Sequence, residues 1–281
     1  RWSRGLGDVY KRQGLRVAEC KSNDDAFVLA ANEADPMNVV AVIQHTAGEY
    51  LGRMEDHLEG RRVRFQYFRP FAAGKLPASD VPADAMILLG GGPWGAAGSR
   101  DLPTLAEEVE LTRQTLAEGT PVVGIGLGAQ ILALAAGGGV EARDLTFEIL
   151  TATRTQDDAL NGYLPQHFNQ VVYMRDWPVL PAHATVLATD NLDRPAVWQV
   201  GENAFGFSGN PGIKLGMVED LIMEFEEVPT DTAEQLEKLR ALQTVLEDQL
   251  VPIMTGLVQC TSLMSSPKAA ESAGELDAQV I

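Results

Sequence analysis

The feature that most constrains the fold of this chain is an alternation of apolar, β-branched runs with helical patterns over its first half. Buried strands are expected at residues 38–43, 63–68, 85–89 and 121–125. Helices are expected at residues 49–59, 103–118 and 130–136. Because parallel strands that alternate with helices are joined by right-handed crossovers, the pattern predicts an α/β fold with a three-layer, doubly wound, mostly parallel sheet.

The second half of the chain changes character. Short extended runs with few helical signals fill residues 144–207, as expected for an antiparallel extension of the sheet. A helix from residue 215 to about 226 closes this domain, which we place at residues 38–228. Residues 229–264 form a C-terminal helical appendage, interrupted at Pro252 and Gly256, with leucine or isoleucine recurring at threes and fours. Its apolar stripe either packs on the parent domain or docks a partner.

The two ends of the chain lack such patterns. Residues 1–37 are expected to form an irregular N-terminal arm that begins with a basic stretch, has no initiating Met and includes non-native sequence. Residues 265–281 are small and polar, which predicts a disordered tail.

Composition excludes several classes of partner. The 281 residues carry a formal net charge of −17, which repels phosphate backbones and anionic lipid, so we expect no nucleic acid. No apolar run approaches the roughly 20 residues of a membrane span. Cys20 and Cys260 lie far apart, and the four histidines show no ligand spacing, so no metal, cofactor or disulfide is predicted. With no secretory signal in the sequence, we expect a cytoplasmic protein.

The segment from residue 121 to 139 indicates a site for chemistry. A buried strand meets a helix there through a glycine-rich turn, which places residue 126 at the carboxyl edge of the sheet above a helix N-terminus. A cysteine at such a position would be favoured as a thiolate, and nearby backbone amides would hold an oxyanion.

Residues 124–130 (Gly-Ile-Gly-Leu-Gly-Ala-Gln) resemble the class I glutamine amidotransferase signature G-[IV]-C-x-G-x-Q, with Gly126 in place of the nucleophilic Cys. Residues 89–93 look like the family's glycine-glycine-proline loop, whose backbone amide helps form the oxyanion hole. Residues 206–212 are similar to G-x-Q-F-H-P-E, with Asn210 in place of the catalytic His and Gly212 in place of the Glu. The resemblance covers residues 39–225, is nearest to the GMP-synthase-like members and implies a flavodoxin-like sheet.

This resemblance implies an amidotransferase-like domain in which all three triad positions, Gly126, Asn210 and Gly212, are degenerate. We therefore expect a pseudoenzyme that works as a non-catalytic binding or regulatory subunit. A protein partner, or a second copy of the chain, would dock through residues 230–260.

A small anionic ligand would bind at the old cleft, where the start of the helix after the turn is expected to be open. Its candidate contacts are Gly91, Gly92, Leu127, Gln130 and His45. The alternative is a cleft that has collapsed or holds only water.

Two other functions stay open at this point. The protein could be an active amidotransferase-like or hydrolase-like enzyme that uses other residues of the same cleft. Residues 124–129 also satisfy G-x-G-x-x-A between a strand and a helix, the dinucleotide-binding pattern, although the glycines could serve only the turn.

Overall fold

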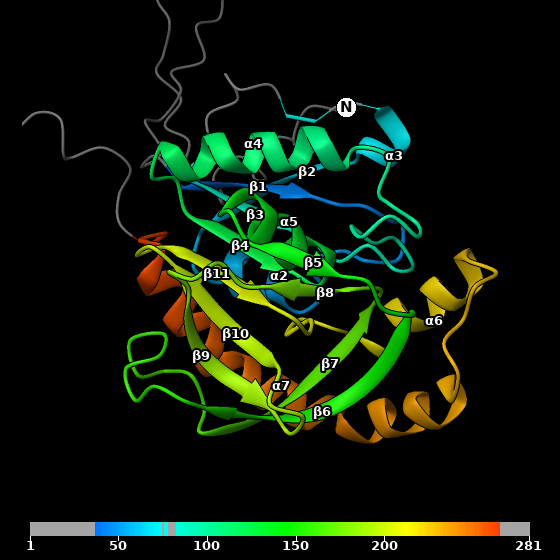
Figure 1. Ribbon diagram of the computed structural model, residues 1–281. Helices are drawn as coiled ribbons and strands as arrows, with labels where there is room; N and C mark the ends of the chain where they lie inside the picture. The colour runs from blue at the N-terminus through cyan, green and yellow to red at the C-terminus, as the bar shows by residue number, and fades with distance from the viewer. Residues whose placement is uncertain (1–36, 75, 78–82, 265–281) are drawn as a thin grey trace, which may run out of the picture. The chain divides into compact units, whose positions relative to one another are not determined.

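The computed structural model describes residues 37–74, 76–77 and 83–264, and Figure 1 shows their arrangement. The helices are α2 (Met54–Glu59), α3 (Pro70–Ala73), α4 (Leu105–Ala117), α5 (Leu127–Ala135), α6 (Leu215–Glu224) and α7 (Thr232–Cys260). The strands of the main sheet are β1 (Val39–Ile43), β2 (Arg64–Phe68), β3 (Ala85–Leu88), β4 (Val122–Ile125), β6 (Thr146–Arg154), β7 (His167–Met174), β9 (Thr185–Asp190), β10 (Pro195–Val200) and β11 (Ala204–Phe207).

The main sheet has a parallel half and an antiparallel half. Within the described residues its order is β2-β1-β3-β4-β11-β10-β9-β6-β7. The first five strands run parallel, and the remaining pairs are antiparallel. A separate antiparallel ribbon joins β5 (Gly139–Glu141) to β8 (Trp177–Val179). The predicted doubly wound sheet with an antiparallel extension is confirmed.

Helices cover both faces of the parallel half, which gives the three layers (Figure 1). On one face, α4 and α5 pack on side chains such as Ile43, Leu88 and Val122. On the other face, α2 and α7 pack on alternate positions of the same strands, including Val42 and Ile125. Successive side chains of a strand point to opposite faces, so a strand buried on both sides is apolar throughout.

The first helix is shorter than the sequence predicts. Residues 49–59 read as one helix, but α2 begins only at Met54, and residues 44–53 form a loop. Gly52 has φ +63°, a left-handed conformation that interrupts a helix. The Arg53 amide donates to the carbonyl of Gly212 at 2.9 Å, a long-range contact that no local pattern reveals. This loop carries Glu49.

The C-terminal appendage is one continuous helix of 29 residues, not a segment broken at Pro252 and Gly256. Its stripe packs on the parent domain: Leu239, Leu246, Leu250, Ile253 and Leu257 are buried within the chain. These side chains are therefore not available as a docking surface.

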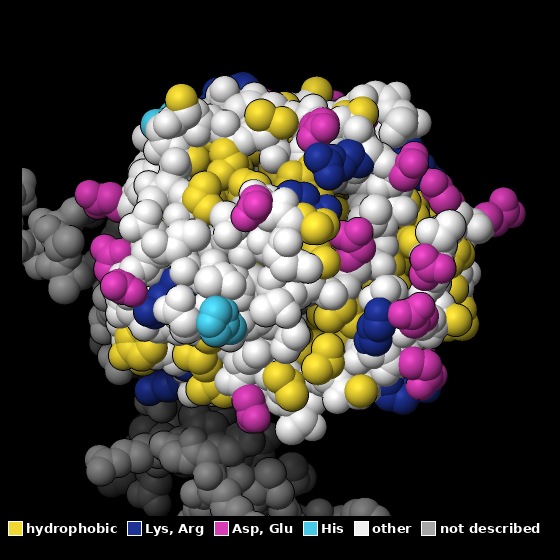
Figure 2. Space-filling view, turned by 60° about the horizontal axis from the view of Figure 1, so that its bottom comes forward, with side chains coloured by type: hydrophobic (Ala, Val, Ile, Leu, Met, Phe, Trp, Pro, Cys, Tyr) yellow, Lys and Arg dark blue, Asp and Glu magenta, His cyan; other side chains and the backbone are white. Residues whose placement is uncertain are grey.

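The predicted N-terminal arm and C-terminal tail lie outside the described residues, apart from Met37. Among the helices that are described, none is both long and apolar enough to cross a membrane. On the face shown in Figure 2, basic and acidic side chains are interspersed and hydrophobic ones form small groups.

Candidate functional site

The predicted turn between β4 and α5 is present. Gly126 has φ +57° and ψ −114°, a conformation that L side chains rarely adopt. Its amide donates to the carbonyl of Phe207 at 2.9 Å, which ties the turn to the end of β11. A β-carbon added to Gly126 would have Gly90 Cα as its nearest neighbour, at 3.5 Å. The turn therefore keeps room for a β-carbon that the sequence does not supply.

The flanking glycines have a packing role. A β-carbon on Gly124 would collide with the backbone of Gly128, and one on Gly128 would collide with the carbonyl of Leu88. The two glycines thus let α5 approach the sheet closely. The Gly128 amide donates to the Leu89 carbonyl at 3.1 Å, and the first turn of α5 is buried. The helix start is therefore not open to a phosphate or other anion, which corrects that expectation and removes the support for a dinucleotide.

The glycine loop after β3 holds a carboxylate of its own chain. The Gly92 amide, a predicted ligand contact, donates to Glu49 Oε2 at 2.6 Å. A β-carbon on Gly90 would collide with the Glu49 carboxylate, and one on Gly91 with the Leu127 side chain. Glu49 itself is 2% exposed. Sequence reasoning missed this residue because it lay within an expected helix.

The surroundings of Glu49 alter its acidity. Burial raises its pKa to about 7, because the charged form loses its hydration. The Gly92 amide and His45 act in the opposite direction, whereas the Glu224 carboxylate adds to the increase.

His45 is buried beneath the glycine loop and does not line an open cleft. Its Nδ1 lies 3.0 Å from the carbonyl of Leu89 and 3.1 Å from that of Gly90, so this nitrogen carries a proton and donates. Its Nε2 lies 2.7 Å from Glu108 Oε2, and neither side chain is exposed. Burial lowers the pKa of His45, but Glu108, the Gly90 carbonyl and Glu49 together outweigh burial, so the pKa is raised. In this structure His45 braces the loop.

Gln130, a predicted ligand contact, is fully buried and serves the β7–β8 connection. Its Nε2 donates to the carbonyl of Arg175 at 2.6 Å. Its Oε1 has no hydrogen-bond partner among the residues that the structure describes. Leu127 is also fully buried, so none of the five predicted contacts is exposed here.

The positions matched to the family's His and Glu lie together after β11. The side chain of Asn210 and the backbone of Gly212 contact each other. Asn210 Oδ1 accepts a hydrogen bond from the Gly212 amide at 2.9 Å. A β-carbon on Gly212 would lie 2.5 Å from the Leu51 carbonyl oxygen, too close for any side chain. The space that a glutamate would need is therefore occupied.

A small cavity adjoins Asn210 under α7. Its volume of about 20 Å³ is enough for one water molecule. Asn210 Nδ2 and Gln170 Nε2 are buried, border this cavity and have no partner among the described residues. Leu246, Leu250 and Ile253 of α7 form its roof.

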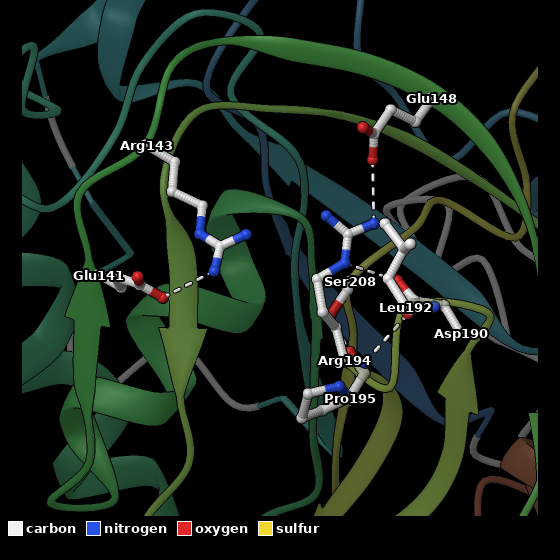
Figure 3. Close-up of polar contacts among 8 residues, drawn as sticks. All are labelled: Glu141, Arg143, Glu148, Asp190, Leu192, Arg194, Pro195 and Ser208. Atoms are coloured by element: carbon white, nitrogen blue, oxygen red, sulfur yellow. Dashed lines mark hydrogen bonds and ion pairs between the residues drawn. The ribbon is translucent and has the colours of Figure 1, made fainter.

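Two arginines that lie over the Trp177 ring of β8 are already paired with carboxylates (Figure 3). Arg194 donates to Asp190 Oδ2 at 2.8 Å and to Glu148 Oε2 at 2.9 Å, and Arg143 pairs with Glu141 at 2.9 Å. The Arg194 guanidinium also lies 4.1 Å from the centre of the buried Trp177 ring. Neither arginine is a free cation for a bound anion.

The described part of the chain was compared with the requirements of a metal site and of a reactive thiol. No group of three or more His, Cys, Asp or Glu residues there could hold a metal ion. Cys260 is a free thiol at the end of α7, and burial raises its pKa, which disfavours the reactive thiolate. Cys20 lies outside the described residues.

Comparison with known proteins agrees with this architecture. The sequence model of the family described as glutamine amidotransferase class-I matches residues 70–193, which include the glycine loop and the turn at Gly126. No curated protein matches the chain. A glutamine amidotransferase structure from Methylobacillus flagellatus has a TM-score of 0.69 and 21% identity, over 80% of this chain and 95% of that one. One from Thermotoga maritima has a TM-score of 0.67 and 24% identity, over 80% and 98%.

The described domain therefore has the class I glutamine amidotransferase fold, and the resemblance predicted from the sequence motifs is confirmed. The family match ends before Asn210 and Gly212, so their correspondence to the family's His and Glu depends on the sequence motif and on their place after β11.

Proposed function

We propose that this protein is a non-catalytic member of the glutamine amidotransferase type, a cytoplasmic pseudoenzyme that acts by binding. The observation that carries the proposal is the turn at Gly126, which has the shape of a nucleophile site and no side chain. Without a nucleophile, no γ-glutamyl thioester can form.

The His and Glu positions support the same proposal. An amide such as Asn210 cannot accept a proton as a general base does. The close approach of Leu51 to Gly212 leaves no room for a carboxylate side chain. Loss of the nucleophile is thus accompanied by a local packing that a triad would not permit.

We also propose two kinds of binding partner for this protein. A subunit role, with another protein or a second copy of the chain as partner, remains part of the proposal. Because the α7 stripe is buried, such a partner would contact another surface. A small anionic ligand remains the second candidate.

Covalent trapping tests the proposal. A glutamine-derived chloroketone should leave the wild-type protein unmodified at residues 124–130 when peptides are analysed by mass spectrometry. Gly126→Cys should become labelled at position 126, because the turn presents that residue beside backbone amides. Labelling at Cys20 or Cys260 is assigned separately by peptide mapping. Wild-type modification anywhere on the turn would contradict the proposal.

A further inference from the structure

We propose that the Glu49 carboxylate is an internal ligand that keeps the glycine loop closed, and that a free small carboxylate takes its place on the Gly92 amide when the Glu49 side chain withdraws. This inference rests on the ligand-binding part of the proposed function and names the ligand class, a small carboxylate, and its donor, the Gly92 amide.

The glycine loop is shaped around this carboxylate. The Gly92 amide donates to Glu49 Oε2 at 2.6 Å, a short contact typical of a charge-assisted hydrogen bond. A side chain on Gly90 would collide with the Glu49 carboxylate, and glycine avoids this collision. Glu49 follows β1 and the glycine loop follows β3, so both stand at the carboxyl edge of the parallel strands, where open α/β sheets bind ligands.

The segment that delivers Glu49 is held by contacts that can open without breaking the sheet. The amides of Ala47 and Gly48 donate to the Glu224 carboxylate of α6, at 3.2 and 3.1 Å. The Glu49 amide donates to Thr46 Oγ1 at 3.1 Å. The Gln44 side chain also donates to the carbonyls of Thr46 and Ala47, at 2.8 and 3.3 Å. Each of these bonds joins the backbone to a side chain, and none belongs to the ladder between β1 and its neighbours.

A buried hydroxyl near the glycine loop supplies a candidate second donor for the carboxylate. The Tyr173 side chain is buried, and its hydroxyl has no hydrogen-bond partner among the described residues. Tyr173 belongs to the same apolar cluster as Leu221, whose side chain packs on Gly92. Burial, with added repulsion from Glu49, raises the pKa of Tyr173 to about 12, so the hydroxyl stays protonated. Buried hydroxyls without a partner are uncommon and call for an explanation.

Protonation should govern the exchange. With a pKa near 7, Glu49 gains a proton within the physiological range, and the neutral acid neither repels an anion nor holds the Gly92 amide as strongly. The charged groups that face it are His45 at the end of β1 and Glu224 on α6, and Tyr173 on β7 is neutral. Carboxylate affinity should therefore fall about tenfold per pH unit above the pKa of Glu49.

Thermal unfolding of the full chain in sodium formate tests the proposal against equal concentrations of sodium chloride. Glu49→Ala should show a higher melting temperature in formate than in chloride at every pH, because formate fills the vacated place. The wild type should show this difference only at or below pH 7. Glu59→Ala, an exposed glutamate on α2, is the matched control and should behave as the wild type. Equal melting temperatures of a folded Glu49→Ala variant in the two salts would overturn the proposal.

A second measurement is independent of the alanine variant. The backbone amide resonance of Gly92 in the wild type should move with pH near 7 and with added formate, and in Glu49→Gln it should not move with pH. A Gly92 resonance that is unchanged by both in the wild type would overturn the proposal. Either result leaves the chloroketone experiment unaffected, so the two proposals fail separately.

Discussion

The turn at Gly126 and the segment from Asn210 to Gly212 differ in what has become of the space for a side chain. At Gly126 the nearest atom to an added β-carbon is 3.5 Å away, whereas at Gly212 a backbone oxygen stands at 2.5 Å. The first position has lost a side chain and kept its shape. The second has closed around the loss, with Leu51 on one side and the α7-covered cavity next to Asn210 on the other.

This difference indicates that the two positions respond unequally to restoration. A strand-to-helix turn is fixed by the packing of α5 on the sheet, which does not depend on residue 126. The Gly212 position is fixed by contact with the loop that precedes α2, which a side chain would displace. Adding the family's residues one at a time should expose the contrast.

The largest effect is expected for Gly212→Glu. The β-carbon meets the Leu51 backbone and the carboxylate enters a buried site, so the free energy of unfolding should fall by more than about 4 kcal/mol. Urea denaturation followed by circular dichroism measures the loss. A variant as stable as the wild type would show that the segment around Gly212 is not closed.

The next largest effect is expected for a substitution on α7, the helix that covers the cavity beside Asn210. Leu250→Ala removes a fully buried side chain beside the Asn210 cavity and should cost roughly 3 kcal/mol of stability. Val251→Ala, one residue on and 51% exposed, is the control and should change stability by less than about 0.5 kcal/mol. Equal effects in the two variants would mean that the stripe of α7 does not pack on the sheet.

Glu49→Gln should give a gain of stability that is comparable in size and depends on pH. The folded-state pKa of Glu49 is raised to about 7, so the folded chain binds this proton more tightly and stability is lost as pH rises from about 4.5 to 7. Glutamine keeps an acceptor for the Gly92 amide and does not ionise. The variant should therefore be roughly 3 kcal/mol more stable than wild type above pH 7, and nearly equal to it near pH 4.5. Urea titrations at both pH values check this, and a constant difference would contradict it.

The smallest effect is expected for Gly126→Cys. The turn has room for the β-carbon, so the cost is the unfavourable conformation at φ +57°, about 1–3 kcal/mol. Measured beside Gly212→Glu under the same conditions, it completes the comparison. A loss at Gly126 equal to that at Gly212 would remove the distinction between an open and a closed position.

Much of the parallel half could be predicted from sequence because its strands are short apolar runs between clear turn signals. The strand expected at residues 121–125 is found at Val122–Ile125, and the turn that follows has the predicted shape. Regular burial on both faces leaves a strong pattern in the sequence, and the glycines of the turn are required by its backbone.

The site could not be predicted as well, because its contacts join distant residues. The loop that carries Glu49 has the composition of a helix, and only the long-range bond from Arg53 to Gly212 and the left-handed Gly52 show otherwise. Pro252 predicted a break in the appendage, yet burial of Leu250 and Ile253 on the sheet keeps α7 continuous. Local propensity was overridden by tertiary packing in both cases.

Ammonia release from glutamine by the purified full chain tests the central claim most directly. With glycine at the nucleophile position and a blocked Gly212, the protein should release no ammonia above a buffer control, alone or with an ammonia-accepting partner. Gly126→Cys alone should also be inactive, because triad residues act as a unit. Wild-type turnover that disappears in Gly126→Val, where a side chain fills the turn, would contradict the account.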